Sequence, residues 1–193
     1  MEQWNNETIK NGMTLIEMLV VTAIMVILTG TFLLNYRAAQ DRFALQRSAN
    51  KLAQDIRRVK AMAMSAEEYP PGSGDVPETG YGIFFNIDIA DTGDDKRYIL
   101  YADTGGGEEF FVGSDDIIET VSLEEGVFIE RIILPPAAPR VRASINFRPP
   151  DPKVRIKFQA AEGEDVKIIL ALESDSSIEK IVSVNNLGLV TVE

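Results

Sequence analysis

The sequence predicts an α+β fold in which one long amino-terminal helix precedes a globular domain of antiparallel strands. Three observations support this prediction. No proline occurs between Met1 and Tyr69, so no residue in that stretch breaks a helix by removing a backbone donor. Residues 70–80 (PPGSGDVPETG) then form a run typical of an exposed connector. From residue 81 onward, short β-branched and aromatic runs alternate with turn residues, which is typical of two packed antiparallel sheets.

The first half of the predicted helix, residues 13–34, is long and apolar enough to cross a bilayer. Its 22 residues would span about 33 Å at ~1.5 Å per residue, against ~30 Å of hydrocarbon. The part from Met18 to Leu34 carries no charged residue. A soluble helix would instead show polar residues at a period of about 3.6. We therefore predict a transmembrane segment rather than a core helix.

A cleaved secretory signal would also explain an apolar segment near the amino terminus. Such a signal has a positively charged start and a small-x-small cleavage site after the apolar run. Residues 1–12 are instead net negative, with Glu2 and Glu7 against Lys10, and the residues after Leu34 offer a poor cleavage site. The pattern favours a segment that is retained.

The second half of the predicted helix, residues 35–69, is amphipathic. Apolar residues recur at alternating spacings of three and four and would pack against the globular domain: Leu45, Ala49, Leu52, Ile56, Val59 and Ala63. The charged residues outside this stripe are expected to face water: Arg42, Arg47, Lys51, Asp55 and Arg58. The helix is expected to end near Tyr69, because Pro70 and Pro71 cannot continue it.

Residues 81–193 are predicted to form the β-rich globular domain. Strands are expected where β-branched and aromatic residues gather between turn residues. The nine predicted strands are Tyr81–Ile87, Arg97–Ala102, Ile117–Leu123, Val127–Leu134, Ala143–Arg148, Lys153–Gln159, Val166–Leu172, Ile178–Val184 and Leu189–Val192.

A short motif marks the boundary between residues 1–12 and the apolar segment. Gly12-Met13-Thr14-Leu15-Ile16-Glu17 places one carboxylate at the entry to a segment that is otherwise uncharged. A charge at the centre of a membrane helix costs about 2.5–3.5 kcal/mol on insertion scales, so this glutamate calls for an explanation. One explanation is local. Thr14 and Glu17 have the spacing of a capping box, in which each side chain satisfies a backbone amide at the start of a helix.

The same six residues resemble the processing site of type IV prepilins and type II secretion pseudopilins. The resemblance implies that residues 1–12 are a leader, that a prepilin peptidase cuts after Gly12, and that Met13 becomes a methylated amino terminus. It also implies that Glu17 pairs with the amino terminus of a neighbouring subunit, which would neutralise two charges that neither chain buries well alone. Met13 stands where phenylalanine is commonest in the family.

Later parts of the chain loosely resemble the H-type minor pseudopilins. The likeness is carried by residues 52–66 followed by Tyr81-Gly82-Ile83, and by residues 182–190. It implies a pilin-like fold and a minor structural subunit of a type IV pilus or a type II secretion pseudopilus. The partners implied are other pilin or pseudopilin subunits, an inner-membrane assembly platform and the lipid bilayer.

The resemblance and the distribution of charge predict opposite orientations in the membrane. The family implies a single pass through the inner (cytoplasmic) membrane, with a cytoplasmic leader and an extracytoplasmic domain that later joins a pilus or pseudopilus. The positive-inside tendency would keep the domain in the cytoplasm, because Arg37 and Arg42 follow the segment and only Lys10 precedes it. We follow the motif, because its six residues match in order at the start of the apolar run.

Composition excludes several kinds of chemistry. The chain has no cysteine and no histidine, which rules out disulfides, thiol nucleophiles, Ser-His triads and the common zinc sites. Carboxylate pairs can catalyse without either residue, but no spacing singles out two of the sixteen acids between Glu67 and Glu125. We therefore expect a protein that is not an enzyme and holds no resident cofactor.

Two charged stretches are candidate binding surfaces. Asp88, Asp91, Asp94 and Asp95 crowd around Gly93, and oxygen-rich loops bind calcium. Their spacing is not that of an EF-hand, and Asp-Gly clusters are also ordinary turns. The basic stretch contains Arg140, Arg142, Arg148, Lys153, Arg155 and Lys157. The whole chain carries a net charge of −11, which disfavours binding to nucleic acid. We therefore expect this basic stretch to dock to an acidic face of another subunit.

The sequence leaves one competing function open. A membrane-tethered domain that binds DNA or a surface ligand, and never polymerises, would need the same anchor and a similar β domain. Retention of residues 1–12 in the mature protein would favour it. Secretion, adhesion, motility and DNA uptake share one subunit plan, so the sequence does not separate them.

Overall fold

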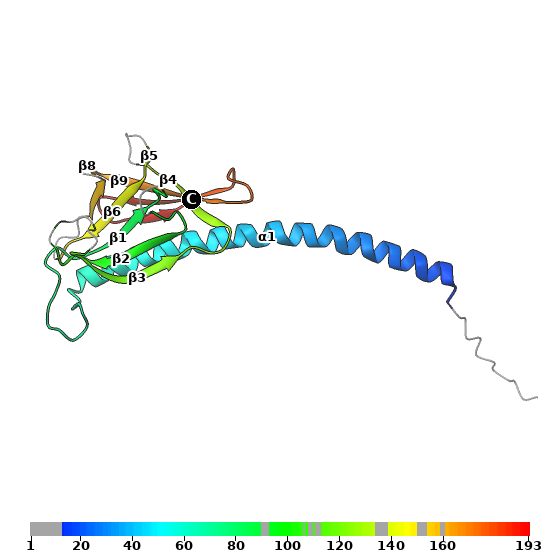
Figure 1. The fold of residues 1–193 in the computed structure, drawn as a ribbon, viewed down its shortest axis with the longest axis horizontal. Coiled ribbons are helices and arrows are strands. Elements are labelled where there is room, and N and C mark those ends of the chain that lie inside the picture. Colours follow the sequence, from blue (N-terminus) through cyan, green and yellow to red (C-terminus); the bar gives the residue numbers. More distant parts are fainter. Residues whose placement is uncertain are drawn as a thin grey trace, which may run out of the picture. The chain divides into compact units, whose positions relative to one another are not determined.

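The computed structural model describes residues 13–89, 93–105, 107, 110, 113–133, 139–149, 154–158 and 161–193. In these residues the chain forms one helix, α1 (Leu15–Met64), followed by strands β1 to β11 (Figure 1). The chain divides into two compact units, Met1–Gln40 and Asp41–Glu193, and α1 contributes to both. A long helix followed by antiparallel sheets confirms the predicted α+β class.

The first unit holds the apolar part of α1. From Met13 to Phe32, every side chain except that of Val21 is exposed. Three threonine hydroxyls in this stretch donate to carbonyl oxygens of the preceding turn, as Thr29 Oγ1 does to Met25 O at 2.7 Å. Internal hydrogen bonds of this kind let a hydroxyl lie in an apolar environment without an unsatisfied donor.

The second unit contains two antiparallel sheets. One has six strands in the order β3-β2-β1-β6-β7-β8, and the other has five in the order β11-β10-β9-β4-β5. The strands are β1 (Tyr81–Asn86), β2 (Arg97–Ala102), β3 (Asp116–Ser122), β4 (Val127–Ile133), β5 (Pro139–Arg140), β6 (Arg142–Phe147), β7 (Val154–Phe158), β8 (Ala161–Gly163), β9 (Asp165–Leu172), β10 (Glu179–Asn185) and β11 (Val190–Val192).

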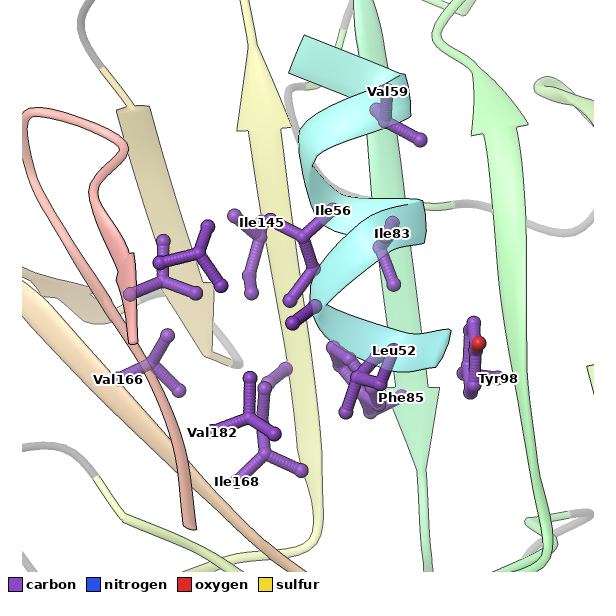
Figure 2. Packing of buried hydrophobic residues seen from close by; sticks show 14 of the residues in the cluster. Leu52, Ile56, Val59, Ile83, Phe85, Tyr98, Ile145, Val166, Ile168 and Val182 are labelled. Carbon is purple, nitrogen blue, oxygen red and sulfur yellow. The ribbon is translucent and has the colours of Figure 1, made fainter. Parts of the chain in front are cut away.

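The core joins the second half of α1 to both sheets. Figure 2 shows Leu52 and Ile56 of the helix beside Ile83 of the six-stranded sheet, with Val166 and Val182 of the five-stranded sheet in the same cluster. All six residues of the predicted apolar stripe are buried, the most exposed being Leu45 at 2%. Full burial of a large apolar side chain contributes about 1.5–3 kcal/mol, so the stripe holds this half of α1 firmly to the sheets.

The helix ends earlier than predicted. The expected end was near Tyr69, but α1 stops at Met64, six residues before Pro70. The amide of Glu67 donates to Met62 O at 3.1 Å and that of Ala66 to Ala63 O at 3.2 Å, the bond pattern of a Schellman motif. Ala66 has the left-handed backbone conformation that this motif requires, with φ of 48°. Local capping therefore ends the helix before the prolines can.

The connector is more tightly folded than predicted. The amide of Tyr69 donates to Asp75 O at 2.9 Å, which closes a loop, and the amide of Gly80 donates to Pro77 O at 3.1 Å. Pro77 and Thr79 are buried, whereas residues 70–76 are exposed as expected. The connector is thus held against the domain at its carboxyl-terminal end.

The nine predicted strands are all present, and their ends in the described residues agree with the prediction to within one residue. The predicted ends Leu134, Lys153 and Gln159 lie outside the described residues. Two short strands, β5 and β8, were missed. They contain two and three residues and no β-branched side chain, so only pairing with β4 and β7 identifies them.

One charged residue of α1 was placed wrongly. Asp55 was expected to face water, but only 3% of it is exposed. Its Oδ2 accepts a hydrogen bond from the Tyr98 hydroxyl of β2 at 2.6 Å, and its Oδ1 pairs with Lys51 Nζ at 2.7 Å. A buried carboxylate is tolerated when a donor and an opposite charge satisfy it. The other four charged residues of the set are exposed as expected.

Candidate assembly site and charged surfaces

Thr14 and Glu17 form a capping box at the start of α1. The amide of Glu17 lies 3.3 Å from Thr14 Oγ1, and the amide of Thr14 lies 3.4 Å from Glu17 Oε2. Both contacts are long for hydrogen bonds and solvent-exposed, which makes the cap a weak one. The local role considered for Glu17 is therefore present, and the carboxylate remains accessible to a second partner.

Met13, next to the cap, is 58% exposed. Gly12 lies outside the described residues, as does the rest of the expected leader. The predicted cut after Gly12 would leave the Met13 amine one residue from the Thr14 amide that faces Glu17. The amino terminus and the carboxylate would then share the first turn of the helix. A negative charge at this end interacts favourably with the helix dipole.

The apolar side chains of the first unit are not covered by the rest of the described chain. An 18-residue window of α1 has a mean hydropathy of 2.2, and none of that window is buried. Leu15 is 84% exposed, and Val26 and Phe32 are each more than 70% exposed. Soluble monomers rarely leave a contiguous apolar patch of this kind uncovered, so lipid or another protein surface must cover it.

The aspartates around Gly93 make turn contacts in the structure. Asp94 Oδ1 accepts from the Lys96 amide at 2.8 Å, and Asp94 Oδ2 pairs with Arg97 Nε at 3.2 Å. The main-chain carbonyls of Asp88 and Asp95 accept amide hydrogen bonds from Gly93 and Ile129. Asp91 lies outside the described residues. Within the described residues, no three acidic side chains gather as metal ligands would, and calcium binding stays the untested alternative to ordinary turns.

The predicted basic stretch divides between strands. Arg140 belongs to β5 and Arg142 to β6, while Arg155 and Lys157 lie on β7. Arg148 follows β6, and Lys153 lies outside the described residues. Lys157 Nζ donates to Gly107 O at 3.2 Å, which places that cation against the loop after β2. Arg140, Arg142, Arg155 and Lys157 are half-buried, whereas Arg148 is exposed. The pairing of Lys157 with Ser144 and of Arg155 with Asn146 places Arg142, Arg155 and Lys157 on one face of β6 and β7, so docking through this stretch stays a prediction.

A buried polar network on the six-stranded sheet was missed by sequence reasoning. Asn146 Nδ2 donates to Asp103 Oδ2 at 3.1 Å, and the hydroxyls of Tyr101 and Ser144 lie 2.6 Å apart. Asp103, Ser144 and Asn146 are fully buried. Burial raises the pKa of Tyr101 above its usual range, although its bonds to Ser144 and Asn146 act in the opposite direction. The network fixes the start of the loop after β2.

Two further cations of α1 have structural partners that the sequence did not reveal. Arg57 donates to Val190 O at 3.0 Å, and Lys60 Nζ donates to both Leu187 O and Gly188 O at 3.1 Å. They connect the helix to the hairpin between β10 and β11. The sequence does not show which main-chain carbonyl a side chain will bind. Only the position of these two residues beside the apolar stripe could have indicated that they lie close to the domain.

Comparisons with known proteins give one finding. No protein-family model and no curated protein matches the chain. Among solved structures, a comparison finds the minor pseudopilin EpsH from the type 2 secretion system of Vibrio cholerae, with a TM-score of 0.42 and 11% sequence identity. The alignment covers 77% of this chain and 95% of that one. A likeness at this level does not establish a family for the chain.

Proposed function

We propose that the chain is a minor structural subunit of a type IV pilus or a type II secretion pseudopilus. In this proposal a prepilin peptidase removes residues 1–12, Met13 is methylated, and an inner-membrane assembly platform moves the subunit from the bilayer into a fibre. The apolar part of α1 then bundles with the helices of other subunits, and the β domain faces outward.

One observation carries the proposal. A single helix begins at the predicted processing site, exposes apolar side chains around its first half, and uses its second half to build the core of a β domain. An apolar helix that its own chain does not cover must be covered by lipid or by other helices. A subunit that passes from membrane to fibre needs both kinds of cover in turn.

Glu17 supplies the reason for assembly to be specific. A carboxylate in an apolar helix bundle is costly unless an opposite charge pairs with it. The ammonium group of a processed Met13 on a neighbouring subunit would provide that charge. The weak cap described above leaves the carboxylate able to exchange its local amide partner for this ion pair.

The proposal is tested by the intact mass and amino-terminal sequence of the full chain, isolated from membranes with and without a prepilin peptidase. We expect a chain that begins at methylated Met13 only when the peptidase is present. Gly12→Leu should leave residues 1–12 attached, whereas the control Gly30→Ala should be cut normally. A mature protein that still begins at Met1 would overturn the proposed function.

The capping box favours a second candidate. If Glu17 does no more than cap the helix, the chain is a membrane-tethered domain that binds DNA or a surface ligand and does not polymerise. The contacts between Thr14 and Glu17 are the specific support for it. The mass measurement separates the two candidates, because a tethered domain has no reason to lose its first twelve residues.

A further inference from the structure

We infer that the face of α1 turned away from the β domain, between Phe43 and Met64, packs against an uncharged helix of another fibre subunit. The inference rests on the proposed function and adds a contact of the second unit to the bundling of the apolar segments. The residues that carry it are called the outer strip, and they recur along the helix at spacings of three, four and seven: Phe43, Gln46, Asn50, Gln54, Ala61 and Met64.

The outer strip lies opposite the residues that build the core. Nine residues make about two and a half helical turns, so side chains nine residues apart point in opposite directions. Phe43 is nine residues from Leu52, and Asn50 is nine residues from Val59. Leu52 and Val59 are fully buried in the cluster that joins α1 to the sheets (Figure 2), whereas Phe43 is 63% exposed. Asn50 and Gln54 are exposed as well.

The charged residues of this part of α1 are bound by the second unit itself. Six charged residues follow Phe43 in the helix, and each has a partner within that unit. Arg57 has the spacing of the outer strip, but it donates to the Val190 carbonyl of β11 at 3.0 Å. The remaining contacts are Arg47 with Glu124, Lys51 with Asp55, Arg58 with Glu119, and Lys60 with the Gly188 carbonyl.

This composition indicates the chemistry of the partner. A helix face that points to solvent normally carries charged residues, but the outer strip has amide, alanine, aromatic and thioether side chains. Two of its amides already bond each other, since Gln46 Nε2 donates to Asn50 Oδ1 at 3.3 Å. A charged surface or nucleic acid would find no opposite charge on the strip. An uncharged helix can pack around Phe43 without taking an ion out of water.

Lipid does not cover the outer strip in the proposed membrane position. Phe43 comes nine residues after Leu34, where the apolar segment ends, which is about 13.5 Å along a helix. The headgroup layer extends only about 5–8 Å beyond the hydrocarbon. The strip therefore begins outside the bilayer, and its cover must be protein. The proposed fibre provides such a cover, because it brings the apolar helices of other subunits out of the membrane.

Photocross-linking from position 43 identifies what covers the strip. The full-length chain, with p-benzoylphenylalanine in place of Phe43, is irradiated in cells that contain a prepilin peptidase and a fibre-assembly system. We expect an adduct whose partner peptide, identified by mass spectrometry, comes from the uncharged helix of another subunit. The control carries the same photoreactive residue in place of Ile89, which is 72% exposed outside α1. Adducts with lipid or with a charged surface only, or a yield no higher than at Ile89, would overturn the inference.

A second arm adds charge to the strip with little change of shape. Asn50→Asp combined with Gln54→Glu should lower the amount of subunit in sheared fibres roughly tenfold or more, because the contact would bury unpaired carboxylates. The matched control Asn186→Asp, an exposed amide outside α1, should leave that amount unchanged. Normal incorporation of the double variant would mean that the strip faces water in the fibre. The photocross-link uses neither charged variant and decides independently if the double variant folds poorly.

The two arms also separate this inference from the proposed function. A chain that begins at methylated Met13 and enters fibres, but cross-links to no helix from position 43, would refute the contact and leave the proposed function standing. A chain that cross-links to an apolar helix, yet keeps residues 1–12 and forms no fibre, would support the contact and refute the proposed function.

Discussion

At the scale of single residues, Glu17 is the position where the two readings of the chain differ most sharply. As a cap it needs only a hydrogen-bond acceptor, and glutamine serves that role as well as glutamate in a capping box. As an assembly residue it needs a negative charge to pair with an ammonium group.

We therefore predict that Glu17→Gln will be processed normally but will fail to enter fibres, as will Glu17→Ala. Thr14→Ala removes the other half of the capping box and keeps the charge, so it should still assemble. The measurement is the amount of tagged subunit in sheared fibres relative to membranes. Normal incorporation of Glu17→Gln would show that the carboxylate acts only as a cap.

A second prediction concerns Asp55 and Tyr98, which join α1 to β2 through a buried 2.6 Å hydrogen bond. Burial and the bond to Asp55 raise the pKa of the Tyr98 hydroxyl far above its usual range, so it stays protonated and donates throughout the physiological range. Tyr98→Phe leaves the buried Asp55 Oδ2 without this donor and should cost about 1–3 kcal/mol of unfolding free energy. Urea unfolding of the full chain in detergent, followed by circular dichroism, measures the loss.

The control for this change is Tyr36→Phe in the first unit, where the tyrosine is 54% exposed. This change also removes a tyrosine hydroxyl, but no buried acceptor loses its donor. The unfolding midpoint of the variant should therefore stay at the wild-type value. An equal effect of the two variants would mean that the Asp55 bond contributes nothing beyond what water supplies.

At the scale of elements, the end of α1 offers the clearest prediction. Ala66 is an exposed alanine in the left-handed conformation, which costs an L-residue roughly 1–2 kcal/mol and glycine almost nothing. Ala66→Gly should therefore stabilise the second unit by about 0.5–1 kcal/mol after the greater freedom of glycine in the unfolded chain is subtracted.

Thermal unfolding of the full chain in detergent measures this gain. The matched control is Ala61→Gly, an exposed position inside the helix, which should lose about 1 kcal/mol because glycine is a poor helix former. Destabilisation by both variants would mean that the Schellman motif does not end the helix in solution.

Much of the element level could be predicted because periodicity reports burial. The stripe from Leu45 to Ala63 marks one buried face of α1, and the structure buries it. Asp55 could not be predicted, since a charged residue next to a stripe faces water unless a partner such as Tyr98 arrives from a distant strand. The end of α1 could not be predicted either, because it requires Ala66 to adopt the left-handed conformation that glycine usually occupies at the end of a helix.

One part of the candidate site, the contact between Thr14 and Glu17, could also be predicted from a local pattern. Thr14 and Glu17 lie close in sequence, so their spacing alone predicts the contact that the structure shows. The hairpin between β10 and β11 is held by long-range contacts, such as that of Lys60 with Leu187 O, and the connector is folded by bonds such as that of the Tyr69 amide with Asp75 O. The sequence pattern reveals neither. The processing step lies at Gly12, outside the described residues, and stays a prediction.

At the scale of the whole molecule, the open question is which side of the membrane the β domain occupies. The resemblance of residues 12–17 to a prepilin processing site predicts that the domain lies outside the cytoplasm, against the bias from Arg37 and Arg42. We predict that Val141→Cys, exposed at 41% in the second unit, will react with a membrane-impermeant maleimide in cells whose outer envelope has been opened.

A cysteine in the leader, Asn5→Cys in the Gly12→Leu background, is the counterpart and should react only after the inner membrane is dissolved. Labelling in the reverse order would show that the positive charges after the apolar segment decide the orientation, and that the motif does not.

The polar contacts along the second half of α1 also bear on how the domain responds to force. Arg47 pairs with Glu124, Arg58 with Glu119, and Arg57 and Lys60 hold the hairpin after β10, so the helix is tied to both sheets along its length. A pull along the helix axis loads these ties and the apolar stripe together, in shear, rather than one after another. Because contacts loaded in shear must break together, we expect the second unit to unfold slowly under tension. The unfolding rate is the quantity that governs forced unfolding. In the fibre proposed above, these contacts would keep the β domain attached to its own helix when the fibre is pulled.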